Sequence, residues 1–191
     1  MGDYTPPIED NLLGISDREK LNEEEAKGII KAEDFMYDLD ESVEINVSLI
    51  LELHQTAFGH LYDWAGKWRT NDFKVGQHIP PSYQEVPTLM YQFLDELDFK
   101  LKSSSDEESL ISVIAYAHHQ MVKIHPFVNG NGRTARLLSD LISILNGYDQ
   151  IILYHGEGEA RQTYLEAIRA ADQYDYSKLE KLIRKQLKPL K

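Results

Sequence analysis

The stretch from His125 to Arg136 limits the possible folds of this chain more than any other, because a glycine-rich loop there joins two apolar runs. The run before the loop, residues 110–124, is apolar enough to be a buried central helix that delivers His125 at its end. The residues after the loop have apolar side chains at helical spacing, which predicts a second helix over residues 133–146. The loop is therefore expected at the start of a helix inside a mostly α-helical domain.

This loop has the residue types of an anion-binding site. Residues 129–132 read Asn-Gly-Asn-Gly and tolerate left-handed backbone angles, which lets successive amide N–H groups converge on one point. Those amides end at a helix N-terminus, where unpaired N–H groups and the helix dipole attract anions. Arg133 and Arg136 are three residues apart, so they leave the first turn on the same side, and both could fork onto phosphate oxygens. His125 stands just upstream, where a base would face the bound group. A plain glycine turn with two surface arginines would not explain this combination.

Other elements follow from apolar periodicity and helix-capping residues. Further helices are predicted over residues 22–38, 43–58, 82–101, 159–171 and 176–187. Asn22 is expected to cap the first of them, with the acidic run 23–25 complementing the helix dipole. Residues 70–81 contain Gly76 and a Pro-Pro pair, which fits a short hairpin. The chain is thus expected to hold an N-terminal segment, residues 1–21, and a single helical domain, residues 22–187, with one small β-hairpin.

Composition narrows the function classes. At 191 residues, 42% hydrophobic and 27% charged, the chain is long enough for a core and typical of a soluble globular protein. The net charge of −12 argues against a broad nucleic-acid surface, although it allows a local basic pocket for one nucleotide. The absence of cysteine excludes disulfides and thiolate chemistry. No apolar run approaches the roughly 20 residues of a membrane span, and no signal-peptide core is present, so the expectation is a cytoplasmic protein without a membrane partner.

The loop resembles the signature of the Fic family, H-x-F-x-[D/E]-G-N-G-R-x-x-R, at every fixed position except one. Where the family has an acidic residue, this chain has Asn129, and in that respect it is similar to the Fic subgroup called mobile mystery protein B. A second stretch, Gly59 to Arg69, resembles Fic sequences as well, which commonly read L-H-x-x-L-F-x-x-V-Y-x-W-A-G-x-x-R in this region. Within it Trp64 is expected to be a packing residue, and His54, just upstream, a structural histidine.

The resemblance implies a Fic-type helical bundle that transfers AMP from ATP to a protein hydroxyl, with His125 as the base. The acidic residue of the family holds Mg²⁺, so the resemblance implies that Asn129 would be the metal-binding position here. The glycine loop would hold the phosphates and a segment near Tyr164 would close over the base, so the implied nucleotide-binding residues are Asn129, Gly130, Asn131, Gly132, Arg133, Arg136 and Tyr164.

Two further segments take their implied roles from the same resemblance. Residues 70–81 correspond to the flap, a hairpin that holds the target segment by strand addition, with Phe73, Lys74 and Val75 as the strand nearest the target. Many Fic proteins also carry an inhibitory helix with the pattern [S/T]-x-x-x-E-[G/N], whose glutamate pairs with the second arginine of the signature. Thr5 and Glu9 fit this pattern but Asp10 does not. The alternative for residues 1–20 is a solvated terminus.

The predicted function is therefore that of a protein adenylyltransferase acting on a Ser, Thr or Tyr hydroxyl of a target protein, with ATP as substrate and Mg²⁺ as cofactor. Control by self-inhibition or by an antitoxin partner, as in toxin–antitoxin pairs, is the implied regulation. The first alternative is another transferase on the same scaffold, such as a kinase-like, phosphocholine-type or AMP-removing enzyme. The second is a catalytically silent nucleotide- or partner-binding module, for which Asn129 is the best support.

Overall fold

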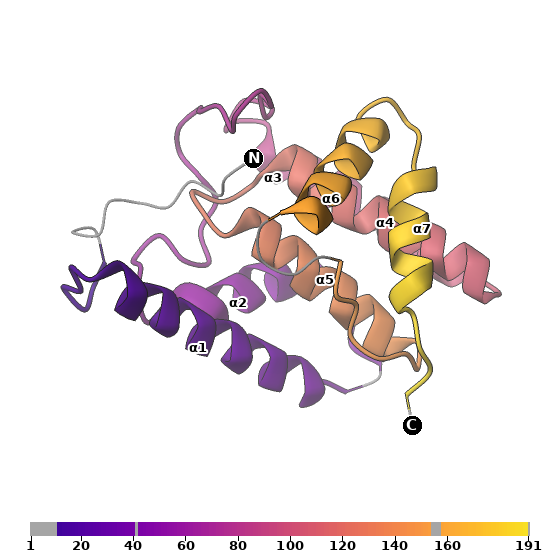
Figure 1. Ribbon diagram of the computed structural model, residues 1–191, viewed down its shortest axis with the longest axis horizontal. Helices are drawn as coiled ribbons and strands as arrows, with labels where there is room; N and C mark the ends of the chain where they lie inside the picture. The colour runs from indigo at the N-terminus through magenta and orange to yellow at the C-terminus, as the bar shows by residue number, and fades with distance from the viewer. Residues whose placement is uncertain (1–10, 41, 154–157, 191) are drawn as a thin grey trace.

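The computed structural model describes residues 11–40, 42–153 and 158–190, and helices dominate that part of the chain (Figure 1). This confirms the prediction of a mostly α-helical fold. The helices are α1 (Arg18–Tyr37), α2 (Val47–Phe58), α3 (Val86–Ser103), α4 (Glu107–Ile124), α5 (Asn131–Leu145), α6 (Glu159–Ala171) and α7 (Ser177–Gln186).

Helix α5 lies at the centre of the packing because its two apolar faces belong to different cores. Leu138 and Ile142 point into the larger core, which α5 shares with α3, α4, α6 and α7. Leu137 and Leu141 point into the smaller core, which α5 shares with α1 and α2. In Figure 1 α5 accordingly runs between the α1–α2 pair on one side and α6 and α7 on the other. The loop before α5 is therefore held by a helix that is packed on both sides.

The first helix begins one turn earlier than the sequence predicted. Asp17, not Asn22, is the N-cap, and its side chain accepts a hydrogen bond from Lys20 N at 2.9 Å. The prediction failed because Asn22 is followed by an acidic run that is typical of a first turn, whereas those glutamates lie in the second turn. Helix α1 thus crosses the predicted boundary between residues 21 and 22.

Two other helices begin later than predicted, the opposite error. Helix α2 begins at Val47 and not at Val43, because the side chain of Asn46 accepts a hydrogen bond from Leu49 N at 3.1 Å and caps the helix there. Helix α3 begins at Val86 and has a proline in its first turn, a position where the missing N–H costs no helical hydrogen bond.

The predicted hairpin over residues 70–81 is reduced to a tight turn. Val75 N donates to His78 O and His78 N donates to Val75 O, both at 3.0 Å, and these bonds form an isolated antiparallel bridge. Residues 70–81 are called the flap below, and outside this turn they have no regular secondary structure.

Among the described helices none is long and apolar enough to cross a membrane.

Candidate active site

His125 sits at the C-cap of α4 in a left-handed conformation, with φ 53° and ψ 58°. Such a conformation costs a residue with a side chain about 1–2 kcal/mol, so the surrounding contacts must impose it. Arg69 supplies two of those contacts: its Nε donates to His125 O and its backbone N donates to Pro126 O, each at 2.9 Å. Arg69 is buried, and it also donates from Nη1 to Asn71 O at 3.1 Å, so it joins the flap to the start of the loop.

The hydrogen bond of the His125 ring sets its tautomer. Nδ1 lies 3.2 Å from Val122 O, and a carbonyl oxygen can only accept, so Nδ1 carries the hydrogen of the neutral ring. The lone pair is then on Nε2, which is the arrangement a general base requires. The ring is largely buried, and the edge of Phe73 from the flap approaches it with ring centroids 5.8 Å apart.

Asn131 closes the loop with its side chain. Its Oδ1 accepts from Phe127 N at 2.8 Å and its Nδ2 donates to Phe127 O at 2.9 Å. Gly130, with φ 75°, is the N-cap of α5, and its carbonyl accepts from Thr134 N at 2.8 Å. The backbone N–H groups of residues 131–133 have no intrahelical partner, as at any helix start, so they could bind an anion and are called the anion cradle below. The predicted cradle also included Gly130, but Gly130 N donates to Asn129 Oδ1 at 2.7 Å. Asn131 therefore contributes its backbone N–H, while its side chain is occupied within the loop.

His54 on α2 contacts the same loop and holds it through a hydrogen bond to the backbone. Gly66 N donates to His54 Nδ1 at 2.9 Å, so Nδ1 is the acceptor and Nε2 carries the hydrogen that is donated to Asn129 O at 3.0 Å. The imidazole stacks on Phe127 with ring centroids 3.6 Å apart. Burial lowers the pKa of His54 to about 3, so the ring stays neutral and keeps this tautomer. The sequence predicted only a structural histidine here, and the structure gives it a more specific role: His54 positions the loop.

Asn129 differs from what a magnesium site requires. Its Oδ1 accepts a hydrogen bond from Gly130 N at 2.7 Å, whereas its Nδ2 is buried and has no hydrogen-bond partner. Mg²⁺ prefers charged oxygen ligands in octahedral geometry, whereas the side-chain oxygen of Asn129 is neutral and already accepts one hydrogen bond. Within the described residues no three His, Cys, Asp or Glu side chains come together as metal ligands. The donor set around Asn129 therefore does not fit the Mg²⁺ site that the family resemblance implied.

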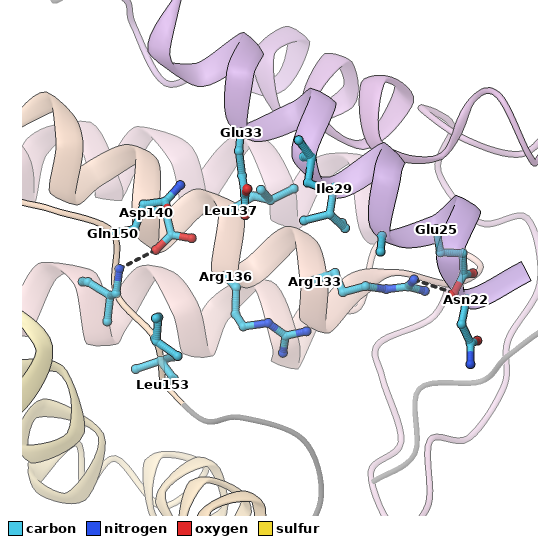
Figure 2. A pocket seen from close by; sticks show the side chains of 14 residues that line it. Asn22, Glu25, Ile29, Glu33, Arg133, Arg136, Leu137, Asp140, Gln150 and Leu153 are labelled. Carbon is cyan, nitrogen blue, oxygen red and sulfur yellow. Dashed lines mark hydrogen bonds and ion pairs between the residues drawn. The ribbon is translucent and has the colours of Figure 1, made fainter. Parts of the chain in front are cut away.

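The two arginines of the loop line a cavity of about 590 Å³ between α1, α5 and residues 150–153, called the α1–α5 trough. Figure 2 shows Arg133 at one end of this trough, directed at Glu25, and Arg136 near its middle. Arg133 Nη1 lies 2.9 Å from Glu25 Oε2, and the Arg133 guanidinium lies over the Phe58 ring, 4.5 Å from its centroid. Glu25 Oε1 in turn accepts from Tyr62 Oη at 2.9 Å. The acidic run 23–25, predicted to serve the helix dipole, thus supplies an ion pair that orients Arg133.

Asp140 closes the other end of the trough and provides a pH-dependent test of this geometry. Burial raises the pKa of its carboxyl from 3.8 to about 7, although a hydrogen bond from Ile151 N at 2.8 Å and the charge of Arg136 oppose the shift. Because the folded pKa lies above the unfolded one, protonated Asp140 stabilises the fold below pH 3.8, and this contribution is lost as the pH rises to about 7.

We expect Asp140→Asn to remove the loss of stability that ionisation of Asp140 causes as the pH rises. Between pH 5 and pH 6 the free energy of unfolding of the wild type should fall relative to the variant by up to about 1.4 kcal/mol. Urea denaturation of both proteins at several pH values measures the difference in free energy of unfolding. The contributions of the other titrating groups are common to both proteins and cancel in this difference. Parallel curves would mean that Asp140 is ionised in the trough already at low pH.

The remaining predicted site residues divide between surface and core. In the flap, Val75 is buried, Phe73 is partly exposed beside the His125 ring, and Lys74 is exposed. Tyr164 is buried, and its hydroxyl lies 2.8 Å from His118 Nε2 in the core. Glu9 lies outside the described residues, so its proposed contact with Arg136 stays a prediction.

Comparison with known proteins agrees with this geometry. The model of the Fic/DOC family matches residues 44–143. The protein adenylyltransferase Fic of Drosophila willistoni is 35% identical over 138 residues, which is 72% of this chain and 26% of that protein. The chain thus spans about a quarter of the length of this curated relative.

Solved structures agree in fold. Fic-1 from C. elegans superposes with a TM-score of 0.70 and 29% identity over 85% of this chain and 48% of the other. BepC, a VirB-translocated effector of Bartonella tribocorum with bound AMPPNP, has a TM-score of 0.72 with 18% identity over 95% of this chain and 92% of the other. The chain belongs to the Fic/DOC family.

Proposed function

We propose that this chain is a protein adenylyltransferase that transfers AMP from ATP to a hydroxyl group of a target protein. The observation that carries the proposal is the tautomer of His125: its hydrogen is on Nδ1 and its lone pair on Nε2, in the loop that leads into the N-terminus of α5. The names of its relatives and the anion cradle of residues 131–133 support the same reaction. Because the matched relative is much longer, its activity is carried over here only as a proposal.

The proposed chemistry follows from the groups of the loop. A Ser, Thr or Tyr hydroxyl with a pKa near 10 or higher is a poor nucleophile at neutral pH, so His125 Nε2 accepts its proton as the oxygen attacks the α-phosphorus. A bond forms between the hydroxyl oxygen and that phosphorus, and the bond from the phosphorus to the bridging oxygen breaks, which releases pyrophosphate. The N–H groups of residues 131–133 stabilise charge on the α-phosphate, and Arg133 and Arg136 stabilise charge on the leaving pyrophosphate.

The direction in which ATP binds decides between this reaction and its rivals. Incubation with a host lysate and ATP labelled at either the α- or the γ-phosphate is the direct test. AMP transfer incorporates only the α-label into protein, whereas a kinase-like reaction incorporates only the γ-label. Nucleotide binding without incorporation of either label would favour a silent binding module.

Cytoplasmic location, and control by an antitoxin partner or by Glu9, stay predictions.

Arg136→Ala is expected to weaken the binding of ATP much more than that of AMP, because the proposal assigns Arg136 to the outer phosphates. A hydrogen bond to a charged group contributes about 1.5–3 kcal/mol, which predicts a roughly ten- to hundredfold loss for ATP alone. Isothermal titration calorimetry with both nucleotides measures it. Arg184→Ala, which breaks an exposed ion pair between Arg184 on α7 and Glu108 on α4, is the matched control. Equal losses for ATP and AMP would remove Arg136 from the outer phosphates.

A further inference from the structure

The orientation of the Asn129 side chain is fixed by its neighbour. Gly130 N can only donate a hydrogen bond, so the side-chain atom 2.7 Å away must be the amide oxygen. The opposite assignment would place an NH₂ group against an N–H group. Nδ2 is therefore the other atom of the amide, the one without a hydrogen-bond partner.

Both oxygens of Asn129 already accept hydrogen bonds from the protein. The side-chain oxygen accepts from Gly130, and the backbone oxygen accepts from Nε2 of His54 at 3.0 Å. His54 is neutral with its hydrogen on Nε2, so this bond does not depend on pH near neutrality. Each neutral oxygen keeps one lone pair, whereas Nδ2 is the one polar group of Asn129 that makes no hydrogen bond to the protein, and it is a donor that a carboxylate would lack.

Nδ2 is also a costly group to leave alone. Asn129 is only 2% exposed, and its Nδ2 has no hydrogen-bond partner. A buried donor without an acceptor costs about 1–3 kcal/mol, and a phosphate oxygen would satisfy it. The neighbouring groups also suit an anion: the start of α5 has a positive dipole, and the nearby carboxylate of Glu25 is occupied by Arg133 and Tyr62.

We propose that Asn129 binds a phosphate oxygen of the nucleotide as a hydrogen-bond donor, and that nucleotide binding in this chain does not require a divalent cation. The proposal rests on the proposed function in that it assumes a nucleotide as the ligand. Asn129 is the one residue that departs from the family signature. A carboxylate at this position would bind a cation, whereas the proposed role of the Asn129 amide is to bind the anionic phosphate directly.

The test compares ATP binding in EDTA and in MgCl₂ for the wild type and for Asn129→Asp. The wild type should bind ATP equally well in both buffers. Asn129→Asp replaces the donor with a charge that repels phosphate, so in EDTA the affinity should fall roughly ten- to hundredfold, the size of one charge-assisted hydrogen bond. Mg²⁺ should restore part of this loss in the variant only. Asn146→Asp adds the same charge at the C-terminal end of α5 and should bind ATP like the wild type in both buffers.

The outcomes separate this inference from the proposed function. Wild-type binding that is lost in EDTA and regained in MgCl₂, with Asn129→Asp equally tight or tighter in MgCl₂, would overturn the inference and leave the proposed function standing. A wild type that binds ATP in neither buffer would overturn both. Melting temperatures of the three proteins without nucleotide show whether Asn129→Asp has kept its fold, and Asn129→Ala, which removes the donor without adding charge, should show a smaller loss that Mg²⁺ does not restore.

Discussion

His125→Ala is expected to lower the rate of AMP transfer by about 10²–10⁴-fold, the usual contribution of a general base. The reason is geometric: the bond from Nδ1 to Val122 O directs the lone pair of Nε2 away from α4, and no other side chain of the loop is a base at this position. ATP affinity should change little, because the phosphates are proposed to bind the amides of residues 131–133 and the two arginines. Incorporation of α-label into protein, together with calorimetry, measures both quantities.

The left-handed backbone at His125 provides a second variant for the same prediction. Alanine at φ 53° keeps the backbone strain, whereas glycine removes it. His125→Gly should therefore be as inactive as His125→Ala but more stable than it by about 1–2 kcal/mol. His60→Ala, which removes a histidine that contacts the Glu24 carbonyl near the start of α1, is the control and should retain transfer. Near-wild-type turnover of the His125→Ala protein would show that His125 is not the general base.

The sequence predicted the elements of the fold well where apolar periodicity was strong. Helix α6 begins and ends at the predicted residues, Glu159 and Ala171, and the buried helix before His125 ends where it was expected. Errors of a few residues arose at helix starts. At α1, Asn22 followed by glutamates resembles a cap and first turn, whereas the local bond from Lys20 N makes Asp17 the cap. Only tertiary packing reveals that Glu25 faces Arg133.

The supporting residues of the candidate site were missed. The signature residues from His125 to Arg136 are contiguous, so their spacing placed them on one loop and helix start, where the structure has them; anion binding there stays a prediction. His54 and Arg69 are distant in sequence and act through backbone carbonyls, which no residue pattern records. The family-like stretch ending at Arg69 was the one available signal. The orientation of the Asn129 amide depends on a single hydrogen bond and could not be predicted from the residue type.

Gly130→Ala is expected to lower transfer by about 10²-fold, the scale associated with moving a site by about 1 Å. Gly130 has φ 75°, and a Cβ there would lie 2.6 Å from Phe58 Cε2 and 2.8 Å from Cζ. Phe58 is completely buried, so the ring cannot move outward to make room. The Arg133 guanidinium lies over this ring, and the centroid of the His54 ring is 4.9 Å from that of Phe58, so the strain should displace both the arginine and the support of the loop.

Gly147→Ala separates this clash from the ordinary cost of a left-handed backbone. Gly147 has φ 82°, but a Cβ there would meet nothing within 4 Å, so it should lose only about 1–2 kcal/mol of stability. Gly130→Ala should lose that amount plus about 1–3 kcal/mol for overpacking, and only Gly130→Ala should lose transfer. Urea denaturation and the α-label assay compare the two. Adding Phe58→Leu to Gly130→Ala removes the clashing ring atoms and should recover part of the stability. If the two glycine variants instead lose equal stability and retain equal activity, close contact between Phe58 and Gly130 does not set the geometry of the loop.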